Sequence, residues 1–302
     1  MNRRDFFTLS TAAALPSRAI SSPASGQRFR KSICDGIVPK SASLEEAFRQ
    51  VKRAGFEGYE ITMGQKLTLE TPPGELKTIA SAARDAGVTI VTVSVSGPFS
   101  NCPLNHPDPA VRAKGVEVIK RSVDITRALG CGAMLLVPSR VGSGAKWMYG
   151  YEDTWKRTSE ELWKAIPYAA QAKIVLTPEN VWNKFLLSPL EMRAFVDQFK
   201  SPWLQAHFDI GNVVQFGYPQ DWIPTLGPRI KRVHLKDFKV QTNRFVPLME
   251  GDVSWKEVMD ALVKIDYRGW LSPEYGYDSS DPEQINKLSA VVDKIYALTG
   301  SV

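Results

Sequence analysis

The 302-residue sequence predicts an α/β protein that folds as a single (β/α)8 barrel, a TIM barrel. From residue 31 onward, short β-rich runs alternate with amphipathic stretches, and no Pro/Ser-rich linker interrupts the alternation. Eight such units in about 270 residues match the size of a closed parallel barrel. An open doubly wound sheet would usually carry a Gly-rich phosphate turn after its first strand, and this sequence has none there. We therefore predict one domain over residues 27–302.

The strands are predicted from eight runs rich in β-branched and aromatic residues. In chain order they cover residues 33–38, 58–62, 89–95, 133–138, 174–178, 204–209, 230–235 and 270–274. Apolar residues at helical spacing predict helices between them, around residues 44–51, 76–83, 116–125, 255–262 and 285–295. Gly55, Gly87 and Gly130 stand just before predicted strands, where helix C-termini are expected.

The N-terminal sequence MNRRDFFTLSTAAALPSRAISSPASG is similar to a twin-arginine export signal. Arg3 and Arg4 precede a short apolar run and a Ser/Pro/Ala stretch. We predict that residues 1–26 are this signal and that the mature protein is periplasmic. The alternative is a frayed helix that happens to contain two arginines. The apolar run is too short to span a bilayer, so no membrane association is expected after removal of the signal.

The composition argues against a nucleic-acid partner and against a disulfide framework. The formal net charge is +6, but lysines and arginines occur in runs no longer than pairs, which indicates a solvated surface. The three cysteines, Cys34, Cys102 and Cys131, cannot all pair within the chain. They also lack the C-x-x-C spacing of zinc and redox sites.

The last four predicted strands end in polar motifs: LTPEN, AHFDIGN, VHLKD and SPEYGY. Reactive groups of a barrel gather at the C-terminal ends of its strands, so these motifs should meet at one mouth. Three carboxylates and one imidazole suit a hard or borderline divalent cation. Each acidic residue taken alone could instead be a helix cap or half of a surface salt bridge. Their matched positions favour a metal site with the ligands Glu179, Asp209, His234 and Glu274.

Together the motifs resemble the sugar phosphate isomerase/epimerase family, the xylose isomerase-like TIM barrels. The resemblance covers the chain after the N-terminal segment and rests on GFEGYEI, PEN, HFDIGN, VHLKD, EGDVSW and PEYG. It implies one divalent ion, Mn2+ ahead of Mg2+, Co2+ or Zn2+, on the four ligands above. It also implies that Glu179 and Glu274 are the acid/base pair. Many ketose epimerases of this group have a histidine where this chain has Asn212.

Four further residues are predicted to contact the substrate, which the resemblance implies is a small sugar. Glu60 comes from GFEGYEI, and Trp182 lies two residues after PEN and could form part of an apolar wall. His207 shares a strand face with Asp209, although it could equally be a core histidine. Lys236 would hold a substrate oxygen, although it could instead pair with Asp237.

The predicted function is a metal-dependent ketose epimerase or aldose–ketose isomerase that removes a proton next to a carbonyl and forms an enediolate. The alternative is a lyase or dehydratase that acts on a keto-sugar or inosose, since its first step is the same. A DNA-repair endonuclease on this fold would need a histidine-rich three-metal cluster, and the chain has only three histidines. A sugar-binding barrel would not need both Glu179 and Glu274. The oligomeric state stays open, with a homodimer and a homotetramer as the candidates.

Overall fold

A ring of eight parallel strands forms the centre of the protein. The computed structural model describes residues 28–64, 66–275, 281 and 283–299. The strands pair in the order β7-β4-β3-β2-β1-β12-β9-β8, and two parallel bridges between β7 and β8 bring the ring close to closure. This is the predicted TIM barrel. The strands are β1 (Arg30–Cys34), β2 (Gly58–Thr62), β3 (Thr89–Ser94), β4 (Ala133–Leu136), β7 (Val175–Pro178), β8 (Ala206–Asp209), β9 (Ile230–Leu235) and β12 (Trp270–Pro273).

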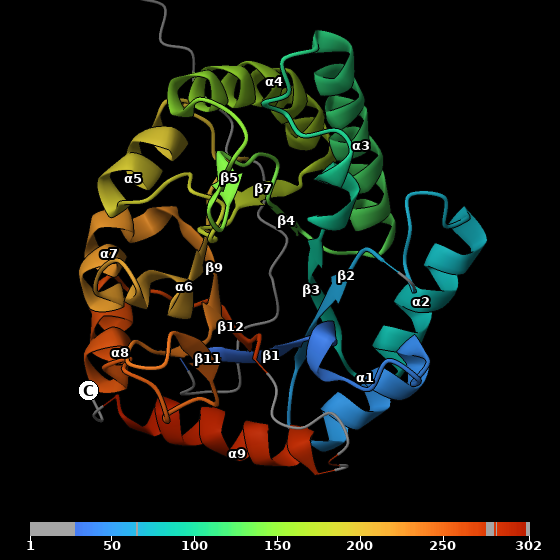
Figure 1. Ribbon diagram of the computed structural model, residues 1–302. Coiled ribbons are helices and arrows are strands. Elements are labelled where there is room, and N and C mark those ends of the chain that lie inside the picture. Colours follow the sequence, from blue (N-terminus) through green and yellow to red (C-terminus); the bar gives the residue numbers. More distant parts are fainter. Residues whose placement is uncertain (1–27, 65, 276–280, 282, 300–302) are drawn as a thin grey trace, which may run out of the picture.

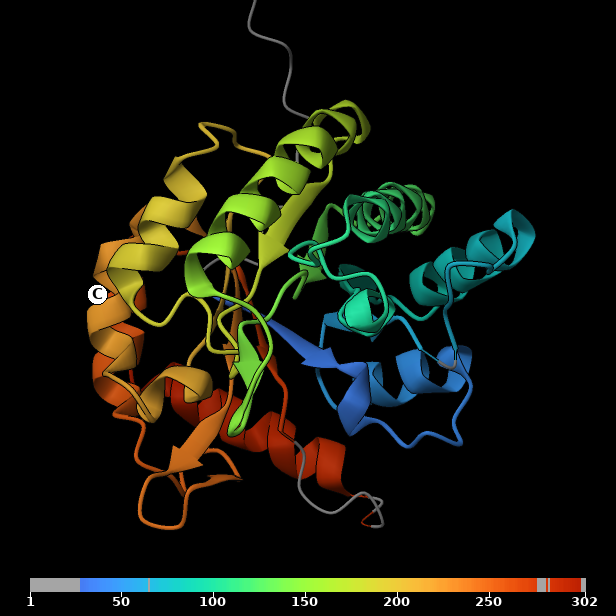
Figure 2. The ribbon, with the colours of Figure 1, turned by 45° about the horizontal axis from the view of Figure 1, so that its top comes forward.

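Helices surround the strands in sequence order, from blue α1 to red α9 (Figure 1, Figure 2). All five helices predicted from apolar spacing are present, as α1, α2, α3, α8 and α9. The longer helices are α1 (Leu44–Arg53), α2 (Pro73–Asp85), α3 (Pro109–Ala128), α4 (Tyr151–Ala172), α5 (Pro189–Asp197), α7 (Pro219–Leu226), α8 (Trp255–Lys264) and α9 (Gln284–Ala297). The short elements are α6 (Gly211–Val214), the hairpins β5 (Gly142–Ser143) with β6 (Lys146–Trp147) and β10 (Asp237–Lys239) with β11 (Arg244–Val246), and the 3-10 turns η1 (Asp35–Ile37), η2 (Gly97–Ser100) and η3 (Gly227–Arg229).

The first strand lies three residues earlier than predicted. Residues 33–38 were expected, but β1 ends at Cys34 and η1 follows it. The carboxylate of Asp35 accepts a hydrogen bond of 2.9 Å from the backbone N–H of Thr62, which ties this turn to the end of β2. Ile37 and Val38 lie outside the strand but are buried, so these positions are apolar. An apolar run of this kind looks like a strand in the sequence.

The helix ends follow the local chemistry of the sequence. Gly55, Gly87 and Gly130 have φ values of 88°, 69° and 73°, a backbone region that favours glycine, as predicted for helix C-termini. At the other end of α1, the hydroxyl of Ser43 accepts a hydrogen bond from the N–H of Glu46, and Asp108 caps α3 in the same way. These caps fix where each of the two helices begins.

The barrel has an apolar outer layer and a polar interior. Between strands and helices, buried apolar side chains pack tightly, as where the rings of Phe48 and Tyr59 meet edge to face at 5.1 Å. Inside the ring, buried polar side chains come from seven strands. They are Ser32, Glu60, Thr92, Thr177, His207, His234 and Ser272. Burying polar groups costs free energy unless they find partners, so this interior points to a site rather than to a simple core.

Three further sequence-based expectations concern the N-terminal segment, the helices and the cysteines. The predicted signal at residues 1–26 lies outside the described residues and stays a prediction. Among the described helices, none combines the length and apolar character needed to cross a membrane. Cys34, Cys102 and Cys131 are all buried and free, as expected for a chain without a disulfide framework.

Candidate metal centre

The four predicted ligands converge at the C-terminal end of the barrel. Glu179 follows β7, Asp209 ends β8, His234 lies near the end of β9, and Glu274 follows β12. One ligand atom from each lies within 4.8 Å of the others. His234 Nδ1 is 3.1 Å from Glu179 Oε1, 3.6 Å from Glu274 Oε2 and 3.8 Å from Asp209 Oδ2. Four consecutive strands of the barrel therefore deliver their polar ends to one point, as the sequence predicts.

The donor set fits a divalent cation. Asp209 Oδ2 and Glu274 Oε2 are both buried. The ammonium of Lys236 lies 2.9 Å from Asp209 Oδ2 and also contacts Glu274 Oε2, so it balances part of the negative charge. Carboxylate oxygens with one imidazole suit Mn2+, Mg2+, Co2+ or Zn2+. Glu179, Asp209, His234 and Glu274 are thus a buried cluster consistent with a divalent metal site.

The two candidate proton carriers have different pKa values. Burial raises the pKa of Glu179 to about 7. Burial also acts on Glu274, but the positive charges of His234 and Lys236 outweigh it and lower the pKa of Glu274 to about 2. Carboxyl groups with separated pKa values are typical of acid/base sites. A bound cation would favour the ionised form of both groups, so metal binding near neutral pH should release a proton.

Two asparagines hold the Asp209 loop against the Glu179 loop. The N–H of Asp209 donates to Asn180 Oδ1 and the amide of Asn180 donates to the carbonyl of Asp209, both at 2.8 Å. The N–H of Asn212 donates to Asp209 Oδ1 at 2.7 Å, and its side-chain amide donates to the carbonyl of Asn180 at 2.9 Å. Asn212 therefore binds neighbouring loops, which gives the position at which this chain departs from many ketose epimerases a structural role.

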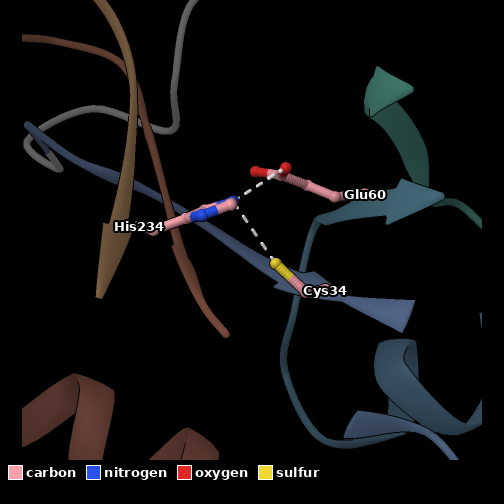
Figure 3. Close-up of side chains that lie close together, drawn as sticks. All are labelled: Cys34, Glu60 and His234. Carbon is pink, nitrogen blue, oxygen red and sulfur yellow. Dashed lines mark hydrogen bonds and ion pairs between the residues drawn. The ribbon is translucent and has the colours of Figure 1, made fainter. Parts of the chain in front are cut away.

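A second contact set lies on the other side of the His234 ring (Figure 3). His234 Nε2 is 3.2 Å from Glu60 Oε2 and 3.5 Å from Cys34 Sγ. The hydroxyl of Ser272 donates to the remaining oxygen of Glu60. If Nε2 carries the proton and donates it to Glu60, Nδ1 keeps its lone pair for a metal ion. Cys34 was not predicted to be a site residue, although it lies at the C-terminal end of β1, just as the predicted site residues lie at strand ends.

His207 lies beside His234, and Trp182 is partly exposed. The His207 ring is fully buried, with its centroid 4.1 Å from that of His234, and its Nε2 has no partner among the described residues. Burial, and then the charge of His234, hold the pKa of His207 well below its usual range, so this ring is neutral. The indole of Trp182 is 37% exposed and donates to the carbonyl of Asn212 at 3.0 Å. Its ring lies 4.9 Å from that of Phe245.

Lys236 pairs with the cluster and not with its neighbour in sequence. The alternative partner, Asp237, is fully buried and faces the segment that contains EGDVSW. Its carboxylate accepts hydrogen bonds from the N–H groups of Phe238, Met249, Gly251 and Val253 and from the indole of Trp255. The two motifs VHLKD and EGDVSW thus form one unit, in which Asp237 holds the loop and Lys236 is left to face the site.

The position of Glu60 leads to a first prediction. Substrate contact by Glu60 stays a prediction, but its carboxylate lies where it can orient the His234 ring and increase its basicity. Glu60→Gln should therefore lower Mn2+ affinity by about 10- to 100-fold, since outer partners of ligating histidines contribute that much. Calorimetric titration with Mn2+ measures the change. Glu57→Gln, which alters a half-exposed glutamate three residues earlier, is the control and should leave affinity unchanged. Equal affinities of both variants would contradict the positioning role.

Known proteins share this fold and part of this sequence. The chain matches the model of the xylose isomerase-like TIM barrel family over residues 48–295. It is 25% identical over 254 residues to the putative L-ribulose-5-phosphate 3-epimerase SgbU of Haemophilus influenzae, covering 80% of this chain and 87% of that one.

Two solved structures are similar in fold. A D-psicose 3-epimerase studied with D-fructose has a TM-score of 0.77 at 19% identity, covering 90% of this chain and 100% of that one. The D-psicose 3-epimerase of Clostridium cellulolyticum H10, solved with D-tagatose, has a TM-score of 0.74 at 17% identity, covering 89% and 99% of the two chains.

Proposed function

Since the chain belongs to the xylose isomerase-like TIM barrel family, we propose that it is a divalent-metal-dependent ketose 3-epimerase. The observation that carries the proposal is the presence of two glutamates, Glu179 and Glu274, in one buried cluster with Asp209 and His234. Proteins similar in sequence or fold are named 3-epimerases of a ketose phosphate or of free ketoses, which supports this reaction class.

The cluster has the groups that inversion next to a carbonyl requires. A divalent ion held by Glu179, Asp209, His234 and Glu274 would supply Lewis-acid polarisation of the ketose carbonyl. One glutamate then removes the proton from the neighbouring carbon, which leaves an enediolate, and the other returns a proton to the opposite face. Glu179 and Glu274 follow β7 and β12, which β8 and β9 separate in the ring. They can therefore approach a substrate from two sides.

Lys236 and His207 suit the developing charge on the substrate. Burial opposes the charged form of Lys236, but Asp209 and Glu274 outweigh it and keep the pKa of Lys236 above its usual range. A permanent ammonium here can donate hydrogen bonds to an oxygen that gains negative charge. The neutral ring of His207 can donate or accept a hydrogen bond without adding charge. These roles complete the proposed site.

We propose an unphosphorylated ketose as the substrate. The exposed part of the Trp182 ring, with Phe216 and Phe245 beside it, offers an apolar wall of the kind that packs against a sugar. The sequence has no Gly-rich turn before a helix near these strands that would hold a phosphate. Export would also favour a free sugar, because phosphosugars are mainly cytoplasmic.

Turnover of ketoses in deuterated water tests the proposal. The Mn2+-loaded protein is incubated with free hexuloses and pentuloses and with one ketose phosphate, and the products are followed by NMR. Inversion at C3 with deuterium at that carbon is the expected result. Release of water with loss of the hydroxyl would favour the alternative function, a lyase or dehydratase. Formation of an aldose would show that the protein is an isomerase. Absence of turnover on every ketose would refute the epimerase assignment.

Export by the twin-arginine route is a separate proposal. Changing Arg3 and Arg4 together to Lys should leave the protein in the cytoplasm, because the route recognises the arginine pair in residues 1–26. Immunoblots of periplasmic and cytoplasmic fractions measure the distribution. Arg18→Lys, in the same segment, is the control and should be exported normally. A periplasmic double variant would show that the pair does not direct export.

A further inference from the structure

A cavity of about 710 Å³ lies at the end of the barrel opposite the metal centre. It opens where the strands begin, with Arg30 at the start of β1, Thr89 at the start of β3, Ile230 at the start of β9 and Trp270 at the start of β12. The cluster around His234 lies at the other end of the same strands. The cavity is therefore not part of the proposed epimerase site.

The cavity lining carries an excess of positive charge. Four cationic side chains but one carboxylate line it: Arg30, Lys231, Arg232, Arg268 and Asp266. The single carboxylate is already engaged, by Arg268 at 3.0 Å and by Arg28 at 2.7 Å. Within the described residues, Lys231 and Arg232 form no ion pair. Burial, and then the charge of Arg232, lower the pKa of Lys231, as expected where a counter-ion is missing.

Arg30 and Arg232 are both held in fixed positions by neighbouring groups. The guanidinium of Arg30 lies 3.8 Å above the ring of Trp270, and its buried Nε has no hydrogen-bond partner in the described part of the chain. Its contact with Glu57 is long, at 3.4 Å. The guanidinium of Arg232 is anchored by two hydrogen bonds of 2.9 Å, to the carbonyls of Val91 and Lys231. Held side chains lose little conformational entropy when they bind a ligand.

A glycine makes this arrangement possible. A Cβ added at Gly58 would lie 2.7 Å from the indole of Trp270 and 2.8 Å from side-chain atoms of Ser32 and Val91. Any larger residue would displace Trp270, which supports the Arg30 guanidinium. The base of the barrel is thus built around an aromatic ring that holds a cation toward the cavity.

We propose that this cavity binds a phosphate group, either as free inorganic phosphate or on a small phosphorylated metabolite. Planar guanidinium groups match the geometry of phosphate oxygens, and the ammonium of Lys231 adds a point charge. A dianion would balance the positive charges of Lys231 and Arg232, which have no acidic partner among the described residues. The site differs from the metal centre in place and in chemistry, so its test does not depend on the proposed epimerase activity.

Calorimetric titration of the Mn2+-loaded protein with inorganic phosphate, and separately with ribose 5-phosphate, tests the site. We expect saturable one-to-one binding of at least one of them, and the tighter ligand identifies the source of the phosphate group. Lys231→Gln and Arg30→Gln should each weaken binding by about tenfold or more, since each removes a charge-assisted hydrogen bond. The two variants are independent, so one that fails to fold leaves the other as the test.

Two controls separate this site from other sources of affinity. Lys256→Gln removes the same charge from an exposed position on α8 and should change binding less than twofold. Asp209→Asn alters the metal centre and should leave phosphate binding intact. Absence of saturable binding to both ligands would overturn the proposal. An equal loss of binding in Lys256→Gln and in Lys231→Gln would also overturn it. A loss confined to Asp209→Asn would place the phosphate at the metal centre and would overturn it as well.

Discussion

Glu179→Gln and Glu274→Gln should each lower ketose turnover by roughly two to four powers of ten. Glutamine keeps an oxygen that can ligate a metal ion but lacks the basic group that moves a proton. Metal affinity should therefore fall modestly while turnover falls steeply. Steady-state kinetics with Mn2+ titration on the same samples measures both effects. Glu257→Gln, at an exposed glutamate on α8, is the control and should match the unmodified protein.

Deuterium exchange sharpens this prediction. In an epimerase, each glutamate serves one face of the substrate, so one of the two variants should still exchange the substrate proton with deuterated water while failing to invert the centre. A dehydratase or a one-base isomerase would not separate exchange from inversion in this way. Near-native turnover in both variants with metal bound would exclude the two-carboxylate mechanism, even if the cluster proves to hold a metal.

The barrel and the four-residue cluster inside it could be predicted because both follow from repeated local patterns. The runs at residues 58–62 and 230–235 coincide with β2 and β9. Parallel strands place their C-terminal ends together, so polar residues at matched strand ends must meet once the ring forms. No further information was needed to predict that four of these residues lie together: Glu179, Asp209, His234 and Glu274. Strand 33–38 was misplaced because buried apolar residues in η1 look the same as a strand in sequence.

Features that depend on how distant segments pack could not be predicted. Whether Lys236 faces Asp237 or the cluster depends on residues 249–255, which donate four hydrogen bonds to Asp237. The contact of Glu60 with His234 joins residues 174 positions apart. It depends on how β2 and β9 are staggered along the barrel axis. The cavity at the opposite end is assembled from strand starts and the loops before them, where the sequence shows no periodic pattern.

Removing the metal should abolish turnover and lower the thermal midpoint of unfolding. An ion that binds only the folded protein stabilises it by about 2.7 kcal/mol when present at 100 times its dissociation constant. For a domain of this size, each kcal/mol shifts the midpoint by about 2–4 °C, so chelation should cost roughly 5–11 °C. Calorimetric scans before and after chelation measure the shift, and added Mn2+ should restore both properties. Elemental analysis that finds no divalent ion after metal loading would contradict the site assignment.

The same measurement should depend on pH in a direction set by Glu179. Burial raises its pKa from 4.5 to about 7 in the folded metal-free protein, so this group favours the folded state below about pH 4.5 and loses that contribution as the pH rises through 7. Burial opposes the charged form of His234, but the negative charges of Glu60 and Glu274 outweigh it and raise the pKa of His234, which therefore acts in the same direction. A bound cation favours the deprotonated forms that the metal-free site disfavours. The midpoint difference between loaded and metal-free protein should therefore be larger at pH 8 than at pH 5. An equal difference at both pH values would show that the ion does not bind at Glu179 and His234.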